Sequence, residues 1–147
     1  MKKIIIWFFI ILIFITGCSN GVASSSSSTT KSDSQKQSGY DLQWYAEQYF
    51  NIASDINRKI IEGDYESGLN LLDEAMKVVG NVKSLNVSSQ YINAKNYLHN
   101  AIFYDSFSLL MTLDKGPKKD RDDAFSNSAY NIQKYVAEMR RLGHNMD

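Results

Sequence analysis

Hydrophobic residues recur every three or four positions from Tyr40 to the end of the chain, the spacing of amphipathic α-helices. No run alternates apolar and polar residues for long enough to predict a strand. The periodic segments are Asp41–Glu62, Tyr65–Val79, Ser88–Asp114 and Asp120–Leu142. Gly63, Gly80 and the pair Gly116-Pro117 stand where these helices are expected to end. Short connections favour antiparallel neighbours, so the sequence predicts an all-α domain, an antiparallel four-helix bundle.

The third segment is apolar nearly all round between Ala101 and Leu113, so we expect it to be the central helix. The second segment has a narrower stripe, formed by Leu69, Leu72, Ala75, Met76 and Val79. The last segment also has one stripe, formed by Phe125, Ala129, Ile132, Val136 and Met139. We expect both stripes to face the core.

The chain before Tyr40 has a different character. Lys2 and Lys3 precede the purely apolar run Ile4–Ile15, which is too short to cross a bilayer core of about 30 Å. Residues 19–39 are rich in serine and poor in large apolar residues, so we expect a disordered tether. The predicted organisation is a cleaved signal peptide (1–17), a cysteine with its linker (18–39) and a helical domain (40–147).

The string Ile15-Thr16-Gly17-Cys18 contains the chain's single cysteine. It resembles the lipobox of bacterial lipoproteins. The resemblance implies cleavage before Cys18, a diacylglyceryl group on its sulfur and attachment to the extracytoplasmic face of a membrane. The alternative is a short uncleaved anchor with an incidental cysteine. With one cysteine, the domain can form no internal disulfide.

The segment Gly63–Met76 begins with Gly63-Asp64-Tyr65, has Gly68 three residues after the tyrosine, and ends in Ala75-Met76. It resembles the turn and second helix of one tetratricopeptide repeat, which implies a helical hairpin with a peptide- or protein-binding surface. Ile56 stands upstream where that family carries a small residue, and no second copy follows. An ordinary helical hairpin is the alternative interpretation.

The sequence offers little catalytic chemistry. The two histidines, His99 and His144, are far apart, and neither a His-x-x-x-His nor a Cys-x-x-Cys spacing occurs. No Gly-x-Ser-x-Gly motif and no glycine-rich phosphate loop is present. We therefore expect a protein that is not an enzyme and has no metal or cofactor.

Asp105 is the unusual polar residue, because it lies in the most apolar part of the third helix. If it is buried it needs a partner, for which Arg58, Lys59 or a tyrosine hydroxyl are candidates. It could instead be a structural contact or face solvent. Tyrosine and tryptophan are common at binding surfaces. The candidate binding residues are therefore Trp44, Tyr45, Tyr49, Tyr104 and Asp105.

The distribution of charge along the chain indicates which classes of partner to expect. The chain has a formal net charge of zero, but residues 40–76 contain eight acidic and two basic residues. Nucleic-acid binding is not expected of such a domain. The sequence favours a lipid-anchored protein-interaction module: an envelope scaffold, accessory subunit or exclusion factor. Its partners would be the membrane, through the lipid on Cys18, and an envelope protein. The alternative is a small-molecule-binding lipoprotein with a ligand inside the bundle.

Overall fold

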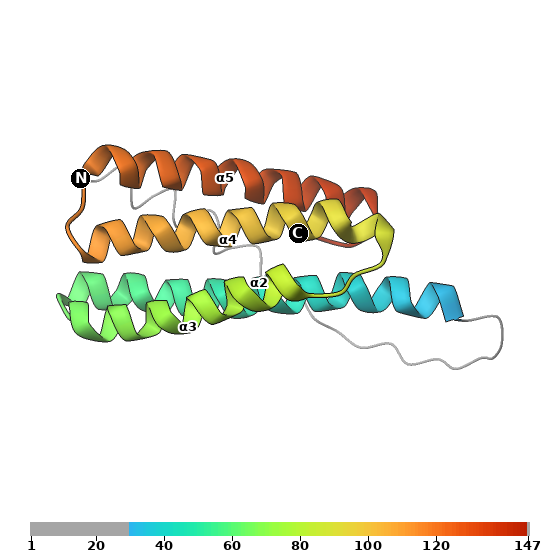
Figure 1. Cartoon of the computed structure of the whole chain (residues 1–147), viewed down its shortest axis with the longest axis horizontal. Coiled ribbons are helices and arrows are strands. Elements are labelled where there is room, and N and C mark those ends of the chain that lie inside the picture. Colours follow the sequence, from blue (N-terminus) through green and yellow to red (C-terminus); the bar gives the residue numbers. More distant parts are fainter. Residues whose placement is uncertain (1–29, 147) are drawn as a thin grey trace.

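The computed structural model describes the backbone of residues 30–146 and the side chains of residues 36–146. Within this part every regular element is a helix, which confirms the all-α prediction (Figure 1). The elements are α2 (Thr30–Glu62), α3 (Tyr65–Ser84), the 3₁₀ turn η2 (Ser89–Tyr91), α4 (Ile92–Leu113) and α5 (Lys118–Arg141). Residues 1–29, including the predicted signal peptide and Cys18, lie outside the described residues.

The helices form two antiparallel hairpins that share α4 as their common contact (Figure 1). In the described chain, α2 packs on α3, α4 packs on both, and α5 packs almost entirely on α4. Helix α5 therefore does not close the bundle against α2 and α3. The prediction that the third segment is the central helix is confirmed, because α4 contacts the other three.

The turns after α2 and α4 both contain a residue in the left-handed conformation, but it is a glycine in only one of them. At the end of α2, Gly63 is left-handed (φ 77°), and the N–H of Asp64 donates to the carbonyl of Lys59 at 3.0 Å. The Asp64 carboxylate then accepts the Ser67 N–H at 3.2 Å, as an N-cap of α3. After α4, Lys115 rather than Gly116 is left-handed (φ 53°).

Two predicted helix boundaries were wrong. Helix α2 begins at Thr30 rather than at Asp41, so the last part of the predicted disordered linker is helical. Tertiary contacts explain this, because Ser38 is buried and its Oγ accepts the Ser88 N–H at 3.1 Å. Helix α3 continues past Gly80 to Ser84, because the fully buried Val82 anchors its last turn.

A C-terminal tail crosses from the end of α5 to the start of α2. His144 Nε2 lies 2.6 Å from the hydroxyl of Tyr91, and the His144 ring packs on Gly39. Gln43 Nε2 on α2 donates to the carbonyl of Asn145 at 3.4 Å. The tail thus ties together the first half of α2, η2 and the end of α5.

The stripe predicted for the last helix was wrong except at Met139, which is fully buried. Phe125 is exposed, and Ala129, Ile132 and Val136 are only half-buried. The buried face of α5 is instead formed by Ala124, Ser128, Asn131, Tyr135 and Met139. Helix α5 lies on the single helix α4, and small residues allow the two backbones to approach closely. The larger apolar residues are left on the flanks.

Candidate functional site

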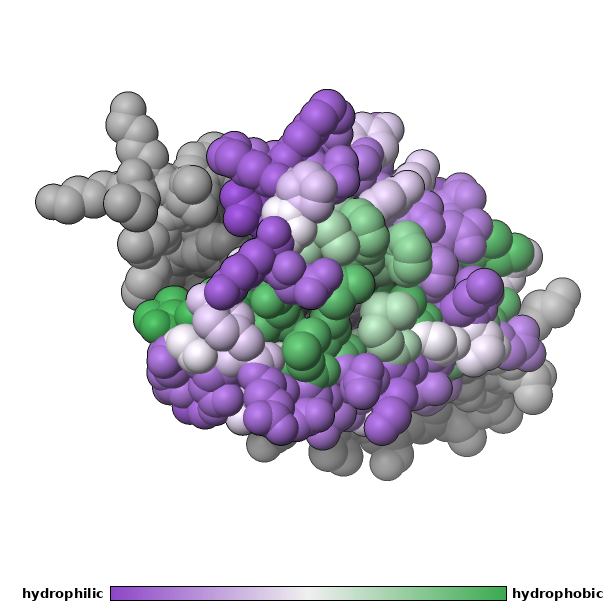
Figure 2. Space-filling view, turned by 60° about the vertical axis from the view of Figure 1, so that its left-hand side comes forward, coloured by the Kyte–Doolittle hydropathy of each residue, from purple (hydrophilic) through white to green (hydrophobic). Residues whose placement is uncertain are grey.

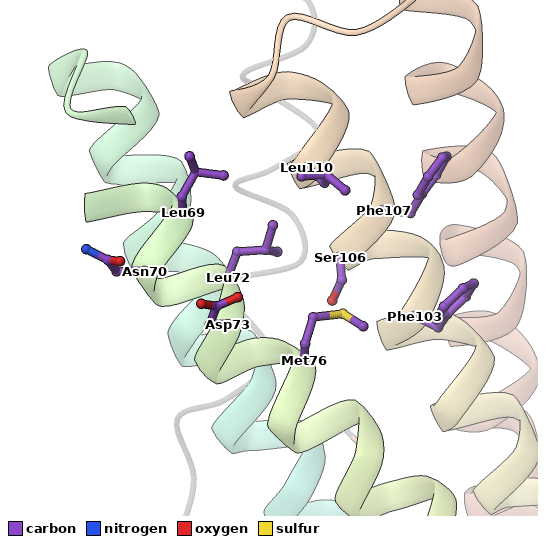
Figure 3. Close-up of a pocket in the computed structure, with 9 residues that line it drawn as sticks. All are labelled: Leu69, Asn70, Leu72, Asp73, Met76, Phe103, Ser106, Phe107 and Leu110. Atoms are coloured by element: carbon purple, nitrogen blue, oxygen red, sulfur yellow. The ribbon is translucent and has the colours of Figure 1, made fainter. Parts of the chain in front are cut away.

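The clearest surface feature is a groove of about 310 Å³ between α3 and α4, the α3–α4 groove (Figure 3). Its lining residues are Leu69, Asn70, Leu72, Asp73, Met76, Phe103, Ser106, Phe107 and Leu110. Four large apolar side chains remain 40–43% exposed there: Leu69, Met76, Phe103 and Phe107. Figure 2 shows hydrophobic side chains gathered into one area on a face of the molecule, with hydrophilic residues around it.

Ser106 links the groove to the core. Its side chain is buried, and its Oγ donates to the Ile102 carbonyl at 2.8 Å and lies 2.9 Å from the Tyr49 hydroxyl. The Tyr49 hydroxyl also donates to Asp105 Oδ2 at 3.0 Å. This Tyr49–Ser106–Asp105 network joins α2 to α4. Of the partners considered for Asp105, the structure selects a tyrosine hydroxyl, whereas Arg58 pairs with Asp55 and Lys59 with Glu62.

Burial controls the electrostatics of this network. It raises the pKa of Asp105 to about 6, and the hydrogen bond from Tyr49 opposes part of that rise. Burial also raises the pKa of Tyr49, with a further contribution from the nearby Asp105 charge. A tyrosine that keeps its proton is a constant donor to Asp105, so the network serves as a polar link between helices.

The five candidate binding residues are divided among separate places. Tyr49 and Asp105 meet in the network. Trp44 is half exposed and contacts Tyr45 edge-on, with ring centroids 4.7 Å apart. Tyr104 lines a smaller hollow of about 210 Å³ between α4 and α5, with Phe107, Asp120, Asp123, Ala124 and Asn127.

The groove residues were not predicted as a site. Leu69 and Met76 belong to a stripe that was expected to face the core, yet both are exposed. Phe103 and Phe107 lie one turn apart on α4 and are exposed as well. The sequence feature that could have indicated the groove is the apolar character of α4 on nearly every side. Three neighbouring helices cannot cover all of such a surface, so part of it stays exposed.

The residues described do not point to a metal or a membrane span. Among them, no group of three or more His, Cys, Asp or Glu side chains is placed to hold a metal ion. None of the described helices is both long and apolar enough to cross a bilayer. Comparison of the chain with protein-family models, curated proteins and solved structures found no match.

Proposed function

We propose that this chain is a lipid-anchored extracytoplasmic protein that acts by binding another protein of the cell envelope. The single observation that carries the binding role is the set of four exposed apolar side chains around the α3–α4 groove. Contiguous exposed apolar surface rimmed by polar residues is typical of protein-interaction sites. The anchor rests on the lipobox resemblance at Cys18.

A protein partner has better support than a small ligand inside the bundle. The groups expected to bind such a ligand, Tyr49 and Asp105, already satisfy each other. The side chains with apolar surface to bury lie instead in an open groove between two helices. Burying them against a partner would remove apolar area from water at about 25 cal/mol per Å².

The anchor is tested by expressing the full chain in a bacterium supplied with an alkyne-tagged fatty acid. The expected result is a labelled band that is shorter than the full chain by the signal peptide. Cys18→Ser should give an unlabelled, uncleaved chain. Equal labelling of both chains would contradict the anchor.

The binding role is tested in the same cells by a photo-reactive residue at Met76. A matched control carries it at Asn81, which is exposed on the same helix but about 140° around its axis from Met76. One envelope protein captured from position 76 and absent from position 81 is the expected result. Identical capture from both positions would contradict a specific partner at the groove.

A further inference from the structure

The groove has the geometry of a helix-binding surface. Leu69 and Met76 lie seven residues apart on α3, about 10 Å or two turns, and Phe103 and Phe107 lie one turn apart on α4. The two pairs come from adjacent helices, and Figure 3 draws Phe103 and Phe107 on the side of α4 away from α3, so the apolar surface continues from the groove across α4. Amphipathic helices bind such grooves through apolar residues spaced three, four and seven apart.

The charged side chains that line the groove and the hollow beside it are all acidic. Asp73 lines the groove and is exposed, and it has no ion pair among the described residues. Phe107 lines both the groove and the adjoining α4–α5 hollow, which adds Asp120 and Asp123. Asp123 is already paired with Lys119, so part of its charge is met within the chain. No lysine, arginine or histidine lines either hollow.

The wider surface has the same sign. Residues 65–76 of α3, the stretch that supplies one side of the groove, carry three acidic residues and no basic one. Two copies meeting through this face would bring like charges together, which opposes association. Charge complementarity therefore favours a cationic partner over a second copy of this chain.

We infer that the α3–α4 groove binds a basic amphipathic helix of a partner protein. This inference rests on the proposed function and adds the chemistry of the partner. The partner's apolar residues would cover Leu69, Met76, Phe103 and Phe107. Its lysines or arginines would face Asp73 and the acidic surface of α3.

The test measures fluorescence anisotropy of labelled model peptides titrated with the full chain in zwitterionic micelles. One peptide has leucines at helical spacing with lysines on the other face. A second replaces the lysines with glutamates, and a third scrambles the leucine–lysine order. Wild-type protein should bind the first peptide most tightly, and binding should weaken as salt is added.

Two groove variants and one control separate groove binding from peptide adsorption to micelles. Phe107→Ala should weaken binding of the leucine–lysine peptide about tenfold, as for a central interface residue. Asp73 is exposed, so Asp73→Lys should not affect folding. It should weaken binding of the leucine–lysine peptide about threefold. Tyr130→Ala removes an exposed aromatic from α5 outside the groove and should leave binding unchanged.

Equal affinity of wild type and both groove variants for the three peptides would overturn the inference. So would concentration-dependent dimer formation that Phe107→Ala abolishes, because the groove would then be an interface between copies. The same variants, scored for the envelope protein captured from position 76, separate the two proposals. If the groove variants lose capture of the envelope protein but the wild-type protein does not bind the leucine–lysine peptide, the basic-helix chemistry is rejected and the proposed function stands. Unchanged capture in both variants rejects the groove as the binding surface.

Discussion

The two sides of α4 are packed in different ways. Toward α2 and α3, the core contains large side chains that solvent does not reach, such as Leu42, Tyr49 and Ile56. Toward α5, the first buried residues of the partner helix are the smaller Ala124, Ser128 and Asn131, and the large Tyr135 and Met139 follow only in its second half. The first side gains stability from apolar area removed from water. The second depends on close approach of two backbones, so the same kind of mutation should act differently on the two sides.

Polar groups follow the same division. On the first side, the Tyr49 hydroxyl has two partners, Asp105 and Ser106. On α5, the Tyr135 hydroxyl is buried without a hydrogen-bond partner in the part of the chain that the structure describes. Its burial raises the pKa of Tyr135. One tyrosine thus fixes how α2 lies on α4, whereas the hydroxyl of the other carries a desolvation cost.

The largest effect is expected from shortening a large core side chain. Ile56→Ala should lower the free energy of unfolding by about 2–5 kcal/mol, because it leaves a cavity at a position with no solvent exposure. Ile132→Ala, at a half-buried position on α5, should cost less than half as much. Urea unfolding followed by circular dichroism measures both. Equal losses would show that the two sides do not differ in packing.

Enlarging a small buried residue tests how closely α5 packs on α4. Ser128→Leu should cost about 1–3 kcal/mol, because it pushes α5 away from α4. Ser126→Leu, on the exposed face of the same helix, is the control and should change stability little. Hydrogen exchange should show faster exchange confined to α5 in Ser128→Leu. Exchange that accelerates equally in α2 would contradict an independently packed α5.

Removing a hydroxyl distinguishes the two buried tyrosines. Tyr49→Phe should cost about 1–3 kcal/mol, because Asp105 loses the hydrogen bond from the Tyr49 hydroxyl, whereas Ser106 keeps its bond to the Ile102 carbonyl. Tyr135→Phe should leave stability unchanged or raise it slightly, because it removes an unpaired polar atom. Thermal unfolding of the pair gives the comparison. A larger loss for Tyr135→Phe would mean that its hydroxyl has a partner in solution.

The last comparison concerns the pH dependence of stability. The pKa of Asp105 in the folded state is about 6, above its ordinary value, so the native state holds its proton more tightly than the unfolded chain does. Its contribution to stability is therefore complete below about pH 4 and is lost as the pH rises through 6. Asp105→Asn should remove this decline. The measurement is the difference in unfolding free energy between wild type and variant from pH 4 to 7.5, and a constant difference would contradict the raised pKa.

The sequence predicted the helices well because their apolar spacing and turn residues are local signals. Gly63 at the end of α2 is one example, since its left-handed conformation and the capping hydrogen bond from Asp64 N–H to Lys59 involve only the last turn of the helix. The buried face of α5 was missed because helical spacing shows that apolar residues share a face, but not whether a neighbour covers that face. Gly80 was misjudged for a related reason: the burial of Val82 outweighs the weak helix propensity of one glycine.

The candidate site was less predictable. Asp105 was recognised because a carboxylate within an apolar helix needs a partner, but the choice of Tyr49 depends on how α2 lies against α4. The groove depends on which apolar residues are left uncovered after all helices have packed. That is a property of the assembled surface, and no single segment contains it.

The C-terminal tail has a consequence for how the molecule could be handled. Because His144 and Asn145 contact Tyr91 and Gln43, the described chain ends against η2 and the first half of α2. A reporter fused to the C-terminus would disturb the contacts that hold this tail against α2 and η2. The turn at Gly63, at the opposite end of α2, is the place for an inserted label to stand clear.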